Sequence, residues 1–218
     1  MHKIEANYTN VHWGYLSADI EPILKINSGD VISINSLSGP PEVTSNCPYP
    51  VKQDLLDIHS KSFRGTLQGG HMCTGPIEIS TLKSGEVLQV DILSIELDSV
   101  WAYTGVSPLK GALPDDFQKK QMTYLEIDKA NLIAKTPWGM EIDLDPFFGL
   151  ICTAPPISWG RIPTVPPRQN GGNMDNKELK VGTSLYLPVF NDGGMFSVGD
   201  GHGNQGDGEI CTAAIEMY

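Results

Sequence analysis

The 218-residue chain is long enough to bury a substantial core, and its 26 acidic and 15 basic residues give a formal net charge of −11. This acidic balance, without a basic cluster interleaved with aromatics, disfavours nucleic acid as a partner. No apolar run approaches the roughly 20 residues of a membrane-spanning helix, and the N-terminus lacks the basic-then-apolar pattern of a signal peptide. We therefore expect a cytoplasmic protein that binds neither nucleic acid nor a membrane.

Alternating apolar and polar residues predict strands along most of the chain. Three of them, at residues 27–34, 83–90 and 180–187, follow a similar turn that contains Gly, which indicates either an internal repeat or a common way to begin a strand. The short patterns at 124–127 and 131–134 flank Asp128-Lys129-Ala130 and predict a hairpin. Further strands are expected at 20–26, 76–82, 86–97, 183–190, 195–198 and 210–215.

Helical patterns are few. The clearest covers residues 50–61 and begins at Pro50. Its apolar side carries Val51, Leu55, Leu56 and Ile58. A short second helix is expected at 115–121, after Pro114. Many short strands separated by Gly and Pro predict a mainly β, sandwich-like architecture with one or two short helices.

Residues 137–173 are rich in proline, which is excluded from helix interiors and central strands. The stretch also holds Trp138 and Trp159, so we expect an ordered loop that its aromatics pack against one face of the protein. Composition justifies no domain boundary, and residues 1–218 are expected to form one domain.

A Gly-rich stretch, Gly199–Glu209, has the composition of a binding or catalytic site, since five of its eleven residues are Gly. The flanking apolar runs predict a tight loop at the end of a sheet, where functional side chains often lie. Its polar residues are Asp200, His202, Asn204, Gln205, Asp207 and Glu209.

Two other segments add candidate ligands. His71 follows Gly69-Gly70, and Asn173 and Asp175 follow Gly171-Gly172. Imidazole and carboxylate groups bind divalent metals such as zinc, and a catalytic site leaves one position for water. A nearby carboxylate can take the proton of that water. The residues therefore suggest metal-assisted hydrolysis.

Other roles remain open for these residues. His202 can equally hydrogen-bond within a tight turn, His71 can cap a strand end, and Asp200 can stabilise an Asx turn. Glu209 precedes an apolar run, where an acid is less expected, which favours a site role. The loop also resembles a calcium loop superficially, but Gln205 occupies the position where an EF-hand has Gly.

The cysteines allow a different chemistry. Because they form no C-x-x-C pair and no secretory signal is evident, we expect free thiols. A thiolate at Cys73 or Cys152 can attack an amide carbon, although both residues also fit an ordinary apolar core. His59 on the predicted helix and His12 beside Trp13 are weaker candidates, the latter for a pocket. The four cysteines are Cys47, Cys73, Cys152 and Cys211.

An ordered set of motifs resembles the acetamidase/formamidase family from about His12 to the end of the chain. The matching motifs lie at 71–77, 146–149, 154–156, 166–168, 171–176, 185–189, 196–202 and 206–209. The resemblance implies hydrolysis of short linear amides to ammonia and a carboxylic acid, a largely β fold, a homo-oligomer and a divalent metal, zinc foremost and calcium as the second choice. It also implies a C-terminal portion of the family that this chain lacks, so part of the pocket or of a subunit interface would be missing or supplied by a partner.

The resemblance places a set of residues at the site, and we infer the role of each. The set is His71, Asn173, Asp175, Asp200, His202 and Glu209. His71, Asp200 and His202 are expected to hold the metal. Glu209 is expected to act as general base, with Asp175 and Asn173 also at the catalytic site. Gln205 and Trp159 are expected to contact the substrate, and Asn173 or Gln205 to orient the amide. A protein that binds metal or a small ligand without turnover, and a thiol-dependent amidase, are the alternatives.

Overall fold

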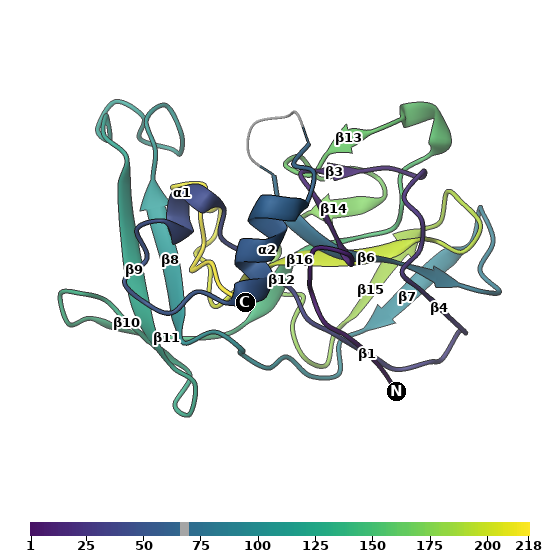
Figure 1. Ribbon diagram of the computed structural model, residues 1–218, viewed down its shortest axis with the longest axis horizontal. Helices are drawn as coiled ribbons and strands as arrows, with labels where there is room; N and C mark the ends of the chain where they lie inside the picture. Colours follow the sequence, from purple (N-terminus) through teal and green to yellow (C-terminus); the bar gives the residue numbers. More distant parts are fainter. Residues whose placement is uncertain (66–69) are drawn as a thin grey trace.

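A computed structural model describes residues 1–65 and 70–218 of the chain. Strands dominate it and helices are few, which confirms the mainly β prediction. Figure 1 shows the strands in two groups, with β8 to β11 on one side, most other strands on the other side, and α2 between them. The position of Gly69, part of the predicted His71 motif, lies outside the described residues.

The larger group contains a six-stranded sheet in the order β14-β12-β16-β6-β2, with β4 pairing β6 in parallel. Register is set by pairs such as Phe147↔His202 and Gly199↔Cys73. In this sheet β16 lies between β12 and β6. The last residues of β16 are the first residues of the predicted Gly-rich site. The strands are β2 (Val11–Trp13), β4 (Leu24–Ile26), β6 (Met72–Ile79), β12 (Phe147–Cys152), β14 (Gly171–Asn173) and β16 (Phe196–His202).

The second group is a four-stranded sheet in the order β11-β10-β9-β8. Its β9 (Gln121–Asp128) and β10 (Ile133–Lys135) pair antiparallel, which confirms the predicted hairpin. The outer strands are β8 (Trp101–Val106) and β11 (Glu141–Asp143).

Three two-stranded ribbons complete the β structure. The ribbon of β7 (Val87–Asp91) and β15 (Ser184–Pro188) joins two of the three similar strand patterns found in the sequence. Leu187 of β15 is buried with Ile77, Ile151 and Phe196 of the six-stranded sheet. This face-to-face packing accounts for the sandwich-like character predicted for the fold. The other ribbons pair β1 (His2–Ile4) with β5 (Ile32–Ile34) and β3 (Tyr15–Leu16) with β13 (Ile162–Pro163).

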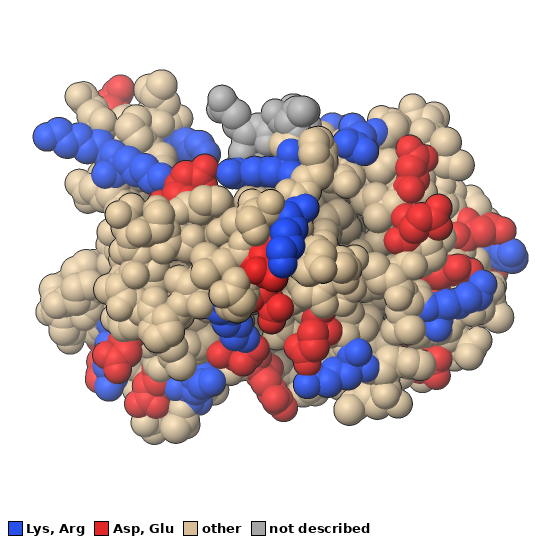
Figure 2. All heavy atoms as spheres, viewed as in Figure 1, with Lys and Arg blue, Asp and Glu red and all other residues tan. Residues whose placement is uncertain are grey.

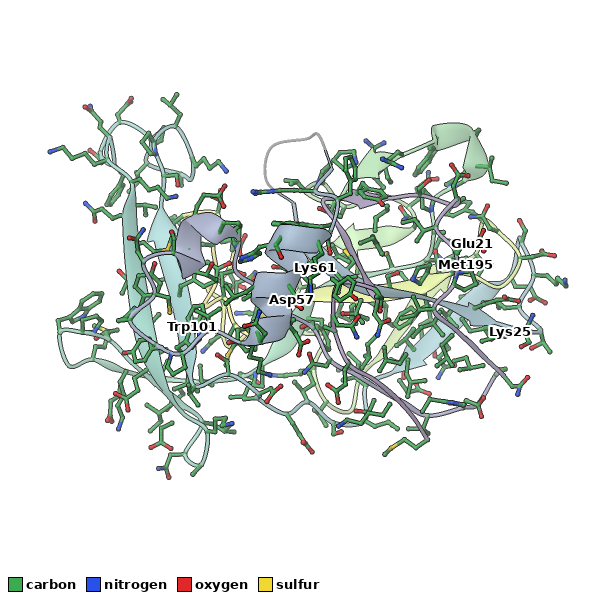
Figure 3. All side chains as sticks on the ribbon, in the orientation of Figure 1. Glu21, Lys25, Asp57, Lys61, Trp101 and Met195 are labelled. Carbon is green, nitrogen blue, oxygen red and sulfur yellow. The ribbon has the colours of Figure 1, made fainter. Side chains whose placement is uncertain are left out.

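Helix α2 (Gln53–Lys61) confirms the clearest helical prediction. It buries Leu55 and Ile58 against Trp101 of β8, which Figure 3 shows on the side of the sheet that faces α2. Leu56, expected on the same apolar side, is 41% exposed. The second short helix is α1 (Pro41–Thr44). Residues 115–120, where it was predicted, are turn and irregular structure, and residue 121 begins β9.

A 3-10 turn, η1 (Ile157–Trp159), is the third helical element. In the described part of the chain no helix combines the length and the apolar character needed to cross a membrane.

The prediction that residues 137–173 form only a loop was wrong, because β12 lies in the interior of the six-stranded sheet. The prolines do not break this strand, since Pro146 precedes it and Pro155 follows it. Between these two positions β12 reads Phe-Phe-Gly-Leu-Ile-Cys, a largely buried apolar run. Such runs are typical of strands covered on both faces.

The Gly-rich stretch was predicted as a loop followed by a strand at 210–215, and both boundaries were wrong. Strand β16 continues through Gly199 to His202, and residues 210–215 are irregular. A Cβ at Gly199 would collide with the carbonyl oxygen of Met72 on β6, so glycine permits the close strand approach here. Glycine therefore marks a crowded strand as well as a turn in this segment.

The C-terminal segment joins the two large sheets. Glu216 exchanges both backbone hydrogen bonds with Tyr103 of β8, at 2.9 and 2.8 Å, and forms an antiparallel bridge with His202 of β16. Ile215 and Met217 pack with Leu125 of β9 in the same core. Residues from three distant parts of the sequence thus meet where the sheets join.

Candidate active site

Strand β16 supplies the centre of the candidate site. Asp200 and His202 are two residues apart, so the strand directs both side chains to one face. His202 Nε2 lies 3.1 Å from Asp200 Oδ2, and His71 Nε2 lies 3.7 Å from the same oxygen. The structure therefore brings together the three residues predicted to hold a metal. Asp200 and His202 are buried and His71 is partly buried.

A fourth group, Glu216, lies beside His202, with Glu216 Oε2 3.6 Å from His202 Nε2. The sequence analysis missed Glu216. The argument applied to Glu209, an acid beside an apolar run, applies equally to Glu216 between Ile215 and Met217. That argument alone could have identified this residue before the structure was known.

Asp175 reaches the site from the segment after β14. Its backbone N–H donates to the carbonyl of Gly149 on β12, and its Oδ2 accepts a hydrogen bond from Asn173 Nδ2 at 2.8 Å. Asp175 has a φ of 46°, in the left-handed region, where Asn and Asp occur more readily than most residues. Asp175 thus reaches the cluster, and Asn173 contacts Asp175.

Gly149 leaves space at the middle of this cluster. A Cβ at this position would lie 2.7 Å from Asp200 Oδ2, and 2.8 Å from both Asp175 Oδ1 and His202 Cε1. Any larger residue would push these three side chains apart. The missing side chain at Gly149 therefore lets them converge.

Gln205 orients His202. Its Oε1 accepts from His202 Nδ1 at 3.0 Å, while its Nε2 donates to the carbonyl of Asp175 at 2.7 Å. Both ends of the Gln205 amide are engaged within the protein. This geometry gives Gln205 a positioning role and directs the other nitrogen of His202 toward the carboxylates.

The site concentrates negative charge around one imidazole. Burial opposes protonation of His202, but the hydrogen bond and charge of Asp200, with Glu216 and Asp175 nearby, raise its pKa to about 10. Burial likewise opposes ionisation of Asp200, yet His71 and His202 hold the pKa of its carboxyl well below its usual range. Both nitrogens of His202 face acceptors, as a protonated imidazole requires. The cluster therefore needs a positive charge at its centre.

The carboxyl groups of Glu209 and Glu216 have raised pKa values, opposite to the shift of Asp200. Burial, followed by the charge of Asp200, raises the pKa of Glu216 to about 8. Burial, followed by the charge of Asp175, raises the pKa of Glu209 to about 7. Carboxyl groups that titrate near neutrality are suited to proton transfer.

The donor set fits a divalent cation. Ligand atoms of Asp175, Asp200 and His202 lie within 4.8 Å of one another, and the same holds for His202, Glu209 and Glu216. Several buried polar atoms nearby have no hydrogen-bond partner among the described residues, and a cation or its water ligands would satisfy them. These atoms are Asp175 Oδ1, Asn173 Oδ1 and His71 Nδ1.

A cavity of about 980 Å³ opens onto the cluster, and His71, Asp200 and Glu216 line it. Its remaining wall includes Tyr103, and the lining residues Lys110 and Lys120 are exposed. Lys and Arg side chains gather above α1 and α2 in Figure 2, whereas most Asp and Glu of this face lie lower and to the right. The cavity therefore runs from basic side chains toward a carboxylate-rich floor.

Trp159, the predicted substrate contact, is not among the described residues that line this cavity. Its ring centroid lies 6.1 Å from that of Phe190, and the guanidinium of Arg168 lies 5.7 Å from the Trp159 ring. Trp159 also packs against the buried cluster that contains Cys73 and Cys152. Its position in η1 at the end of a core cluster gives it a packing role.

All four cysteines are free thiols, as predicted. Burial raises the pKa of the Cys152 thiol to about 12 and that of Cys73 well above its ordinary value. Both groups are protonated near neutral pH, which disfavours the thiol-dependent alternative. His12, the other weak candidate, is buried and lies 3.2 Å from Ser197 Oγ through its Nε2, outside the carboxylate cluster.

The fold and the site together define a class of protein. Its members are mainly β, and their central sheet carries a buried cluster of imidazole and carboxylate groups. The chain belongs to the acetamidase/formamidase family, whose model matches residues 3–161 and 160–218. This membership confirms the resemblance found in the motifs.

Individual relatives agree with this membership. The chain is 31% identical over 206 residues to an acetamidase of Mycolicibacterium smegmatis, and 32% identical over 199 residues to a formamidase of Methylophilus methylotrophus. Each match covers 67% of this chain, and 51% and 49% of the respective relative. The chain thus spans about half the length of these relatives.

Solved structures show the same fold. An acetamidase from Bacillus halodurans superposes with a TM-score of 0.78 at 25% identity, over 97% of this chain and 66% of that one. A gamma lactamase from Delftia acidovorans gives a TM-score of 0.79 at 23% identity, over 98% of this chain and 65% of that one.

Proposed function

We propose that the protein hydrolyses the C–N bond of short linear amides, giving ammonia and a carboxylate. The observation that carries the proposal is the convergence of Asp175, Asp200, His202 and Glu216 beside a 980 Å³ cavity that Asp200 and Glu216 line. Family membership supports the same reaction class, because relatives named acetamidase and formamidase match over most of the described chain.

Asp175, Asp200 and His202 would hold a divalent metal, with His71 beside Asp200. Zinc is the first choice because its ligands are typically imidazole and carboxylate, and calcium is the second. When bound, such an ion supplies Lewis acidity and lowers the pKa of a bound water. His202 would then be neutral, and its hydrogen bond to Gln205 Oε1 would present Nε2 to the ion.

The remaining residues would handle protons and orientation. Glu209, whose pKa is raised to about 7, suits a general base that takes a proton from water. Asn173 anchors Asp175 through Nδ2, and its Oδ1 has no partner among the residues that the structure describes, so it can accept a hydrogen bond from the amide N–H₂ of a substrate. Gln205 would act through His202, because both ends of its own amide are occupied.

The basic side chains on the cavity favour an anionic product. Hydrolysis leaves a carboxylate in a site whose floor is already negative, which promotes its departure. The exposed Lys110 and Lys120 line the route outward, and Arg64 lies there with Glu42 at 3.1 Å. The electrostatic potential would therefore change from negative at the cavity floor to positive at its exposed side, along the path that the product carboxylate takes.

A homo-oligomer is also proposed. The segment between β8 and β9 exposes Leu109, Leu113 and Phe117 beside the cavity, and Ile210 lies next to it through a backbone hydrogen bond from Ala112. Exposed apolar groups that cluster in this way commonly mark protein contacts. Light scattering during size-exclusion chromatography would measure the assembly directly, and a monomer at micromolar concentration would reject the proposal.

The test of function is ammonia release from formamide, acetamide and propionamide, before and after chelator treatment with zinc add-back. We expect release that falls with chelator and returns with zinc, and at least a hundredfold loss in Asp200→Asn. Asp207→Asn is the matched control, because Asp207 lies in the same loop but is 87% exposed at its side chain.

The same experiment separates the alternative function. Stoichiometric metal binding without ammonia from any amide would reject the amidase and favour a protein that binds a cation or a small polar ligand. Ammonia release that survives complete metal removal would instead reject the metal-assisted mechanism while retaining the amidase.

A further inference from the structure

Strand β8 places a tyrosine next to the candidate site. Tyr103 and Glu216 exchange both backbone hydrogen bonds, so the two residues form a directly opposed antiparallel pair. Opposed residues of such a pair project their side chains to the same side. Glu216 is also opposed to His202, which places Tyr103, Glu216 and His202 in one row across the junction of the two sheets.

Tyr103 lines the same cavity as His71, Asp200 and Glu216, and so does Ser38, whose hydroxyl lies next to the Tyr103 hydroxyl. Its ring is held in place on several sides. The Trp101 ring centroid lies 6.2 Å away, and a Cβ at Gly39 would contact the Tyr103 ring edge at 3.6 Å. The phenol is therefore fixed relative to the cavity floor by its strand and by its neighbours.

The hydroxyl of Tyr103 is weakly engaged within the protein. Its contact with Ser38 Oγ is 3.4 Å, longer than the usual O–H···O hydrogen bond of about 2.7 Å. A ligand oxygen in the cavity would therefore compete well for the phenolic proton. For comparison, Tyr124, the partner of Tyr103 across β8 and β9, donates a 2.7 Å hydrogen bond to the carbonyl of Val43.

We propose that the Tyr103 hydroxyl donates a hydrogen bond to the carbonyl oxygen of the amide and to the oxyanion that forms there when water adds. This inference rests on the proposed function. Carboxylates dominate the cavity floor, and a developing negative charge needs a donor among them. Tyr103 supplies that donor without adding another negative group.

The phenol remains neutral throughout this role. Burial, followed by the charge of Glu216, raises the pKa of Tyr103 well above its ordinary value, so the proton stays on the oxygen. Water adds to the carbonyl carbon, the C–N bond breaks, and ammonia leaves with a proton delivered by a site carboxyl group. Tyr103 forms and breaks only hydrogen bonds, and it retains contact with an oxygen of the product carboxylate.

The decisive variant is Tyr103→Phe, with Tyr124→Phe as the matched control. Loss of one oxyanion donor typically lowers kcat by about 10²–10³-fold. We expect a loss of that order in Tyr103→Phe with KM changed less than threefold, and kcat within threefold of the wild type in Tyr124→Phe. A kcat for Tyr103→Phe within a factor of two of the wild type would overturn the proposal.

A second measurement does not depend on turnover or on the folding of Tyr103→Phe. Fluorotyrosine introduced at position 103 keeps the ring and the hydroxyl, and its ¹⁹F resonance reports directly on the phenol. We expect acetate and acetamide to shift this resonance, while fluorotyrosine at position 124 is unaffected. The absence of any shift at position 103 at saturating ligand would overturn the inference.

The two measurements also distinguish this inference from the proposed function. A wild-type protein that releases no ammonia but shows the position-103 shift would reject the amidase, and with it the oxyanion role, and would leave only the hydrogen bond from Tyr103 to a bound ligand. A protein that releases ammonia without the shift would reject only the role of Tyr103.

Discussion

Glu216 Oε2 lies 3.6 Å from His202 Nε2, and the two residues face each other across the bridge between the C-terminal segment and β16. The contact makes His202 the meeting point of acidic groups from two separate parts of the chain, Asp200 on its own strand and Glu216 on the segment that joins the sheets. We expect the charge state of His202 to depend on both.

Glu216→Gln tests this dependence in metal-free protein. Removal of one neighbouring negative charge should lower the pKa of His202 from about 10 by about one unit. Asp200 remains the stronger partner, so the value should stay above that of a free imidazole. The imidazole resonances of His202 across a pH series measure the change, and Glu141→Gln on the exposed edge strand β11 serves as the control. An unchanged His202 titration in Glu216→Gln would contradict the charge coupling.

Gln205→Leu should weaken metal binding by about 10–100-fold, because the acceptor for His202 Nδ1 is lost while the ligands themselves remain. Zinc affinity measured by competition with a chromogenic chelator is the readout. Gln118→Leu is the control, since Gln118 is an exposed residue whose side chain donates a local hydrogen bond to the carbonyl of Asp115. Equal zinc affinities for the wild type and Gln205→Leu would show that His202 needs no orienting partner.

Gly149→Ala should abolish metal binding and amide hydrolysis with little loss of fold. The added methyl group would occupy the space where Asp175, Asp200 and His202 converge, at distances of 2.7–2.8 Å. The control is Gly206→Ala in the Gly-rich stretch, where a Cβ would meet no atom of the described residues within 4 Å. Circular dichroism and metal titration on both variants give the comparison. Full zinc stoichiometry in Gly149→Ala would mean that the cluster is not the metal site.

His12 should contribute an acid-sensitive component to stability. Burial lowers the pKa of its imidazole from 6.5 to about 4, although a hydrogen bond to the carbonyl of Tyr15 opposes the shift. Between these two values the unfolded chain binds more protons than the folded protein, so the free energy of unfolding should fall as pH drops from 6.5 to 4. The loss is about 3 kcal/mol below pH 4, from roughly 1.4 kcal/mol per pKa unit.

Urea denaturation at a series of pH values measures this component. His12→Gln should show a flatter dependence of unfolding free energy between pH 6.5 and 4 than the wild type. His2→Gln is the control, because the His2 side chain is 40% exposed. If wild type and His12→Gln have parallel pH profiles, His12 does not remain neutral in the folded protein.

Much of the site was predictable from local composition. Glycine-flanked imidazole and carboxylate residues led to His71, Asp175, Asp200 and His202, because such a combination is unusual in strand-rich sequence. Local composition marks Glu216 only as an acid beside an apolar run, and it does not reveal Tyr103. Both reach the site through a pairing between residues 103 and 216, and no periodicity within either segment encodes that partner.

The fold, like the site, could be predicted where the pattern is local and not where it depends on distant residues. Alternation found the β9–β10 hairpin and the strands of the β7–β15 ribbon, whose patterns are local. It missed β12, because the surrounding prolines concealed an apolar strand between Pro146 and Pro155. It also misplaced the end of β16, where Gly199 serves close strand packing and not a turn.

Glu216 pairs with both β8 and β16, so it couples ligand binding to the packing of the two sheets. Any cation or substrate that draws His202 and Glu216 together also stabilises the contact between β8 and β16, since the same short segment makes both. By mass action, a ligand at a hundred times its dissociation constant would add about 2.7 kcal/mol to the free energy of unfolding. Ligand-free protein should therefore unfold first at the contact between β8 and β16. The four-stranded sheet should separate from the six-stranded one before either sheet unfolds.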